Sequence, residues 1–138
     1  MRTLALYAFL LAVAACSRPA GASAVAHCAA GDTALVRDVL YFGRNTPGGH
    51  ELSDSAWQQF VDQVLTPRFP AGLTIWDAAG QWRGASGQVE RERSKVLTLL
   101  HAGDSVSDGL VIEVVGEYKQ RFAQEAVLRE RVATCSRF

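Results

Sequence analysis

Six polar side chains are the best candidates for a ligand-binding site, and they lie on two predicted strands and at the end of a predicted helix. They are Tyr41, Glu92, Ser94, Tyr118, Arg121 and Gln124. Arginine can hold a carboxylate or another small anion through paired N–H donors, so this set predicts the binding of a small anion. The competing interpretation is a hydrogen-bonded network that fixes the helix end, with Arg121 on Glu92 or Glu125, because ion-pair networks resemble sites.

The rest of the sequence holds no signature for a metal, a phosphate or a nucleophile. The three histidines, His27, His50 and His101, lack the spacing of metal ligands, and Ser94 lacks the G-x-S-x-G context of a nucleophilic serine. Acidic and basic residues balance at 14 each, which gives no electrostatic reason to expect nucleic acid. We therefore predict no metal, no cofactor and no nucleic-acid partner.

Two hypotheses for the function belong to different classes. The first is a cofactor-free module that binds a small ligand or another protein, and that forms a homodimer through the face of a predicted sheet that the predicted helices leave open. The alternative is a small cofactor-independent enzyme, similar in architecture to isomerases and monooxygenases, in which Tyr41 or Tyr118 is the acid and Glu92 the base. Both depend on whether the fold forms a cavity at these residues.

The N-terminus is typical of a bacterial export signal. One positive charge precedes an uncharged run over residues 4–15, which is shorter than the roughly 20 residues that span a bilayer. The run ends Val13-Ala14-Ala15-Cys16, which resembles the lipobox of bacterial lipoproteins and implies cleavage before Cys16 and a lipid on its sulfur. Ser17 in place of Asp then predicts the periplasmic face of the outer membrane.

Another cleavage site is also present. Ala22-Ser23-Ala24 fits ordinary signal peptidase, which would release a soluble periplasmic protein that starts at Val25. With the lipoprotein site, residues 1–15 are the signal peptide, residues 16–30 a flexible tether, and residues 31–138 a single domain.

Cys28 and Cys135 remain if Cys16 is lipidated, and they are an even pair in an oxidising compartment. They lie at the two ends of the predicted domain. We therefore predict a disulfide between them.

Periodicity predicts six elements in the order strand, helix, strand, strand, helix, strand. Strands are expected over residues 33–43, 73–83, 88–101 and 126–135, the second of them bulged or bent at Gly80. One helix begins after Ser53 and is stopped by Pro67; the other begins near Asp104 or Ser107 and ends at Phe122. This order predicts an α+β, ferredoxin-like domain with a four-stranded antiparallel sheet and two helices on one face.

Several segments of the chain resemble a bacterial family of small exported proteins known as domain of unknown function 3574. The segments are Tyr41-Phe42-Gly43, Trp57 with Phe60, residues 66–74, Gly80-Gln81-Trp82, residues 91–94 and residues 118–128. The resemblance covers most of the chain from the first strand onward. It implies the same fold and a lipoprotein address, and it supplies no mechanism.

Overall fold

The computed structural model describes residues 27–137, so the predicted signal peptide, Cys16 and most of the predicted tether lie outside the described residues. The main strands are β1 (Thr33–Gly43), β4 (Thr74–Arg83), β5 (Val89–His101) and β6 (Leu128–Ser136), and a short ribbon is formed by β2 (Asn45–Thr46) and β3 (His50–Glu51). The helical segments are α1 (Asp54–Phe60), η1 (Val61–Leu65), α2 (Thr66–Arg68) and α3 (Ser105–Phe122). Within residues 27–137, no helix is both long enough and apolar enough to cross a membrane.

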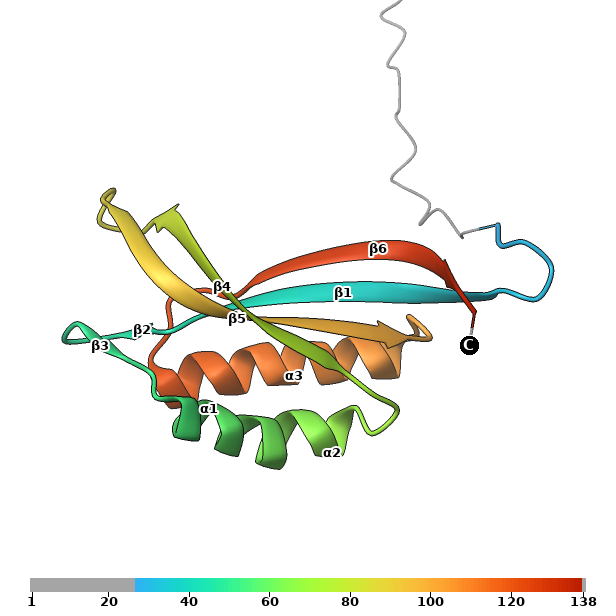
Figure 1. Cartoon of the computed structure of the whole chain (residues 1–138), viewed down its shortest axis with the longest axis horizontal. Coiled ribbons are helices and arrows are strands. Elements are labelled where there is room, and N and C mark those ends of the chain that lie inside the picture. Colours follow the sequence, from blue (N-terminus) through green and yellow to red (C-terminus); the bar gives the residue numbers. More distant parts are fainter. Residues whose placement is uncertain (1–26, 138) are drawn as a thin grey trace, which may run out of the picture.

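The four main strands form one sheet in the order β4-β5-β1-β6, and every neighbouring pair is antiparallel. All the helical segments cover one face of this sheet, and the other face stays open (Figure 1). The predicted ferredoxin-like α+β fold is therefore confirmed.

The core lies between the sheet and the helices, because side chains alternate between the two faces of each strand. Leu40 and Phe42 of β1 and Leu97 and Leu99 of β5 are buried against the helices. The helices contribute their apolar stripes, as the spacing of these residues predicts. Their fully or nearly buried members are Trp57, Phe60, Val61, Val64, Leu65, Val111, Val114 and Tyr118.

Both predicted helix starts are confirmed by their caps. The amide of Ala56 donates to the Ser53 hydroxyl at 3.2 Å, and the amide of Ser107 donates to the Asp104 carboxylate at 2.7 Å. Of the two alternatives at the second helix, Asp104 is thus the capping residue.

The predicted stop of the first helix at Pro67 is wrong, because helical structure continues through Arg68. The preceding segment, η1, is π-helical, and the amide of Thr66 bonds to the carbonyl of Val61, five residues back. This wider turn gives the proline ring more room beside the preceding carbonyls than an α-helical turn does.

Of the two alternatives predicted at Gly80, a bulge or a bend, the bulge is wrong. β4 pairs with β5 without interruption from Thr74 opposite Thr98 to Arg83 opposite Val89. Glycine here lies in regularly paired strand, and an inserted residue, which defines a bulge, is absent from this ladder.

The predicted disulfide between Cys28 and Cys135 is present, with a Cα–Cα distance of 5.5 Å. It follows from the sheet order, since β1 and β6 pair antiparallel and Ala34 lies opposite Cys135. The bond therefore ties the beginning of the domain to its last strand.

Candidate functional site

A pocket of about 540 Å³ opens on the uncovered face of the sheet. It lies where the β4–β5 hairpin curls away from the end of β1 and the beginning of β6 (Figure 1). Three of the predicted site residues, Tyr41, Glu92 and Ser94, line it. The other lining residues are Gly43, Gly80, Gln81, Trp82, Ala126, Val127 and Leu128.

Glu92 lies directly over the backbone of Gly43. A Cβ atom on Gly43 would come within 2.5 Å of both carboxylate oxygens of Glu92, so the absence of a side chain makes room for the carboxylate. The amide of Asn45 donates to Glu92 Oε2 at 3.2 Å. The backbone of Gly43 and Asn45, at the end of β1 and the start of β2, therefore positions this carboxylate.

The other polar groups of the pocket have few protein partners. The Tyr41 hydroxyl donates to Glu130 Oε1 at 3.3 Å. The indole N–H of Trp82 is buried and has no hydrogen-bond partner among the described residues. The Ser94 hydroxyl likewise makes no hydrogen bond to another residue in the described part of the chain.

Tyr118 and Gln124 lie behind the pocket. The buried hydroxyl of Tyr118 donates to the carbonyl of Gly43 at 2.8 Å, and Gln124 Nε2 donates to the carbonyl of Asn45 at 2.6 Å. Burial, followed by the charge of Glu92, raises the pKa of Tyr118. These two side chains therefore hold the backbone that carries Glu92, and Tyr118 is too deeply buried to act as an acid toward a ligand in the pocket.

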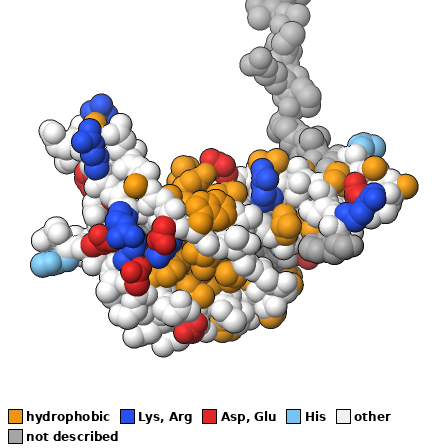
Figure 2. Space-filling model, viewed as in Figure 1, with side chains coloured by type: hydrophobic (Ala, Val, Ile, Leu, Met, Phe, Trp, Pro, Cys, Tyr) orange, Lys and Arg blue, Asp and Glu red, His pale blue; other side chains and the backbone are white. Residues whose placement is uncertain are grey.

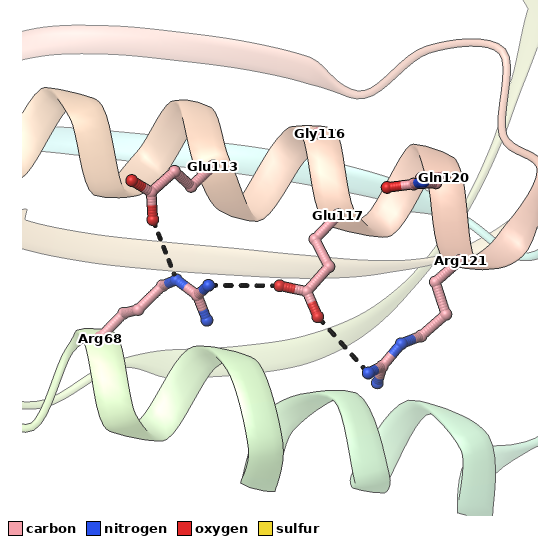
Figure 3. Close-up of a pocket in the computed structure, with 6 residues that line it drawn as sticks. All are labelled: Arg68, Glu113, Gly116, Glu117, Gln120 and Arg121. Atoms are coloured by element: carbon pink, nitrogen blue, oxygen red, sulfur yellow. Dashed lines mark hydrogen bonds and ion pairs between the residues drawn. The ribbon is translucent and has the colours of Figure 1, made fainter.

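Arg121 does not join the other five predicted residues. It lies in a groove between α2 and α3, where an ion-pair ladder joins the two helices (Figure 3). The ladder runs from Glu113 to Arg68 at 3.5 Å, from Arg68 to Glu117 at 3.3 Å, and from Glu117 to Arg121 at 3.4 Å. The expected pairing of Arg121 with Glu92 or Glu125 is thus replaced by pairing with Glu117 and a hydrogen bond to Gln63.

A second polar cluster, centred on Asp38, lies on the helix side of the sheet. Asp38 is fully buried and receives two hydrogen bonds from Arg129, at 3.1 and 2.6 Å, and one from His101 Nε2 at 2.8 Å. The amide of Gly103 donates to His101 Nδ1 at 3.1 Å, which leaves the ring proton on Nε2. Arg129 also binds Asp108 of α3, so this cluster joins β1, β5, β6 and α3.

Neither polar cluster forms a candidate metal site. Among the described residues, no group of three or more His, Cys, Asp or Glu side chains could hold a metal ion. His101 binds Asp38, whereas His50 is exposed in β3.

Sequence reasoning missed the pocket wall formed by Trp82 and by residues 126–128. The alternation of side chains along β4 and the register of the β4–β5 hairpin would have placed Trp82 at the pocket. Gly80 lies opposite Glu92, and Trp82 is two positions further along β4, opposite Glu90. Residues two positions apart in a strand face the same side, so Trp82 faces the same side of the sheet as Glu92.

Together, the sheet order, the helices on one face and the pocket define a ferredoxin-like α+β domain with a cavity on its open face. The chain belongs to the family described as protein of unknown function (DUF3574), which matches residues 37–138. No curated protein matches the chain.

Solved structures with the same fold are only distantly similar in sequence. A phage SAM lyase in complex with S-methyl-5'-thioadenosine has a TM-score of 0.60 and 14% identity, over 75% of this chain and 90% of that one. CutA from Synechococcus elongatus, complexed with a Bis-Tris molecule, has a TM-score of 0.51 and 14% identity, over 76% of this chain and 86% of that one. At these identities the likeness extends to the fold alone.

Proposed function

We propose that the protein is an envelope lipoprotein whose domain binds a small organic molecule in the pocket around Glu92. The observation that carries this proposal is the pocket itself. It combines an apolar and aromatic wall, including Trp82 and Leu128, with a few polar groups, which is the usual make-up of a small-molecule site.

The pocket is also rigidly built, which favours binding. Tyr118 and Gln124 fix the backbone at Gly43 and Asn45, and β4 and β5 are paired along the full length of the hairpin. A preformed site loses less conformational entropy on binding than one that must first become ordered.

A fragment screen followed by two-dimensional ¹⁵N NMR tests the proposal. The three tryptophan indole signals are natural reporters, because Trp82 lines the pocket, Trp57 is buried in the core and Trp76 is 45% exposed elsewhere on the sheet. We expect hits to shift the Trp82 signal and leave that of Trp57 in place. Hits that perturb only the groove between α2 and α3, or a screen without hits, would contradict the proposal.

The enzyme alternative has one observation in its favour: Tyr41 and Glu92 line the same pocket. Burial, followed by the charge of Glu130 and the hydrogen bond to it, raises the pKa of Tyr41, which keeps the phenol protonated and able to act as an acid. If this alternative holds, a bound fragment should be converted over hours by the wild type and remain unchanged with Tyr41→Phe. Binding without turnover favours the first proposal.

The open sheet face further suggests a homodimer. It exposes Leu100 at 38% and Val132 at 48%, and Arg37 between them forms no ion pair with another described residue. Figure 2 shows that hydrophobic side chains also gather over the middle of the molecule in the view of Figure 1.

The dimer is tested by sedimentation with two matched variants. Val132→Glu places a charge on the open face, whereas Ile112→Glu places one on α3 at a residue that is 59% exposed. We expect a dimer for the wild type and for Ile112→Glu and a monomer for Val132→Glu. A monomeric wild type at concentrations of about 100 μM, where weak dimers form, would contradict the dimer.

A further inference from the structure

We propose that the ligand of this pocket is an organic cation, such as a primary amine that carries an apolar group. This inference rests on the proposed binding function and adds the chemical class of the ligand. The sequence predicts an anionic ligand, and this inference predicts a cationic one. The charge differs because Arg121, the predicted anion-binding side chain, lies in the groove between α2 and α3 and not in the pocket.

The distribution of ion pairs around the pocket carries the inference. Glu51, Glu113 and Glu117 each pair with arginine. Four glutamates of residues 27–137 form no ion pair with another described residue, and one of them, Glu92, lines the pocket. The four are Glu90, Glu92, Glu125 and Glu130.

Glu92 lines the pocket, and the other three glutamates neighbour residues that line it. Glu130 accepts the hydroxyl hydrogen of Tyr41, Glu90 lies opposite Trp82, and Glu125 precedes Ala126. Glu90 and Glu125 both approach Gly84, where a Cβ atom would lie 2.5 Å from an oxygen of Glu90 and 3.8 Å from an oxygen of Glu125. Neighbouring like charges repel one another, and a cation bound beside Glu92 lowers that repulsion.

The basic side chains near the hairpin are directed to other partners. Figure 2 shows Lys and Arg side chains on the hairpin and beside it. Arg83 donates to the carbonyl of Gly87, Arg91 to Gln81, and Arg93 pairs with Glu51. No basic residue lines the pocket, although Arg91 and Arg93 line an adjoining hollow that shares Glu92.

The remaining lining residues suit an organic cation better than a bare metal ion. Tyr41, Trp82, Val127 and Leu128 offer aromatic and apolar surface, and an aromatic face also attracts a cation. The buried indole N–H of Trp82 adds one donor without a partner among the described residues, which an acceptor atom on the ligand could satisfy.

The experiment compares three phenylalkyl probes of similar size and different charge: 2-phenylethylamine, 2-phenylethanol and 3-phenylpropionate. They are titrated by NMR, with the Trp82 indole signal as reporter, into the chain from residue 16 onward carrying Cys16→Ser. A charge-assisted hydrogen bond to Glu92 should make the amine bind about tenfold more tightly than the alcohol. The carboxylate probe should bind most weakly.

Three variants test whether Glu92 causes the preference for the amine probe. Glu92→Gln keeps an oxygen for the amide of Asn45 and should reduce amine binding to the level of the alcohol. Gly43→Ala displaces the carboxylate without removing its charge and should weaken amine binding as well. Glu113→Gln, at an exposed glutamate on α3, is the matched control and should leave the preference unchanged.

The outcomes separate this inference from the proposed function. The inference that the ligand is a cation would be refuted by any of three results: equal binding of the three probes, tighter binding of the carboxylate probe, or an amine preference that is unchanged in Glu92→Gln. Each of these results would leave the proposed binding function in place. Two other results would also refute the organic cation. One is a shift of the Trp82 signal by Ca²⁺ alone that requires Glu92, and the other is uncharged fragment hits that bind Glu92→Gln as tightly as the wild type. Failure of every probe and every fragment would overturn the binding function itself.

Discussion

Asp38→Asn tests the buried cluster that joins β1 to β5, β6 and α3. Asp38 has no exposed surface and receives three hydrogen bonds from Arg129 and His101. The amide of asparagine turns one acceptor into a donor that faces these donors, and it leaves the Arg129 guanidinium without its buried counter-charge. We therefore expect the variant to be less stable than the wild type.

The magnitude follows from the surroundings of Arg129. Removing one partner of a buried ion pair costs about 3–5 kcal/mol. The Arg129 side chain is 21% exposed and keeps Asp108 at 2.7 Å, so we expect the lower end of this range, about 3 kcal/mol. For a domain of this size that corresponds to a melting temperature lowered by about 12 °C.

The pH dependence has a defined sign. Burial raises the pKa of Asp38, but hydrogen bonds from Arg129 and His101, together with their charges, outweigh it and hold the pKa below its ordinary value. The stabilisation is therefore fully present above the unfolded pKa of about 3.9 and is lost as the pH falls through the folded value. The difference in the free energy of unfolding between wild type and variant should be constant near neutral pH and should decrease below about pH 4.

Urea and thermal unfolding followed by circular dichroism, at several pH values, measure this gap. Asp62→Asn is the matched control, because the exposed Asp62 carboxylate only accepts a hydrogen bond from Gln58, and it should change stability by less than about 0.5 kcal/mol. An Asp38→Asn variant within about 1 kcal/mol of the wild type, or a gap that persists unchanged to pH 2.5, would refute the reasoning.

Three further predictions concern other parts of the chain. A fatty-acid probe should label the wild type and not Cys16→Ser, and equal labelling of both would contradict the lipid anchor. Arg121→Ala should cost only about 0.5–1 kcal/mol, because the pair with Glu117 is partly exposed, and a loss of several kcal/mol in urea unfolding would contradict this value. Cys135→Ala should cost about 4–5 kcal/mol in the chain-entropy model, because the disulfide spans 107 residues, and unchanged unfolding in the presence and absence of reductant would argue against that value.

The fold could be predicted from the sequence because its signals are local. Alternation in β1 places Leu40 and Phe42 on one face and Tyr41 on the other, and the stripe of Val111, Val114 and Tyr118 is visible at helical spacing. The order of the elements then leaves few topologies, and the one found also brings the two cysteines together.

The candidate site could be predicted only in part, because it depends on how elements sit relative to one another. Tyr41, Glu92 and Ser94 share a face by strand alternation, and they do line one pocket. Arg121 pairs with Glu117 one turn earlier in α3, a partner that helical spacing does reveal, whereas its hydrogen bond to Gln63 of η1 depends on how the two helices pack. Trp82 enters the site through the curl of the hairpin, which no short stretch of sequence encodes.

The direction of β1 has a consequence for a domain attached to a surface through its N-terminus. The disulfide lies where β1 begins, and the pocket lies where β1 ends, 11 residues further along the strand. At about 3.3 Å per residue, β1 acts as a spacer of roughly 35 Å between the two. If the chain is anchored through residue 16, β1 therefore carries the pocket away from Cys28, the end of the described domain that is nearer to the anchor along the sequence.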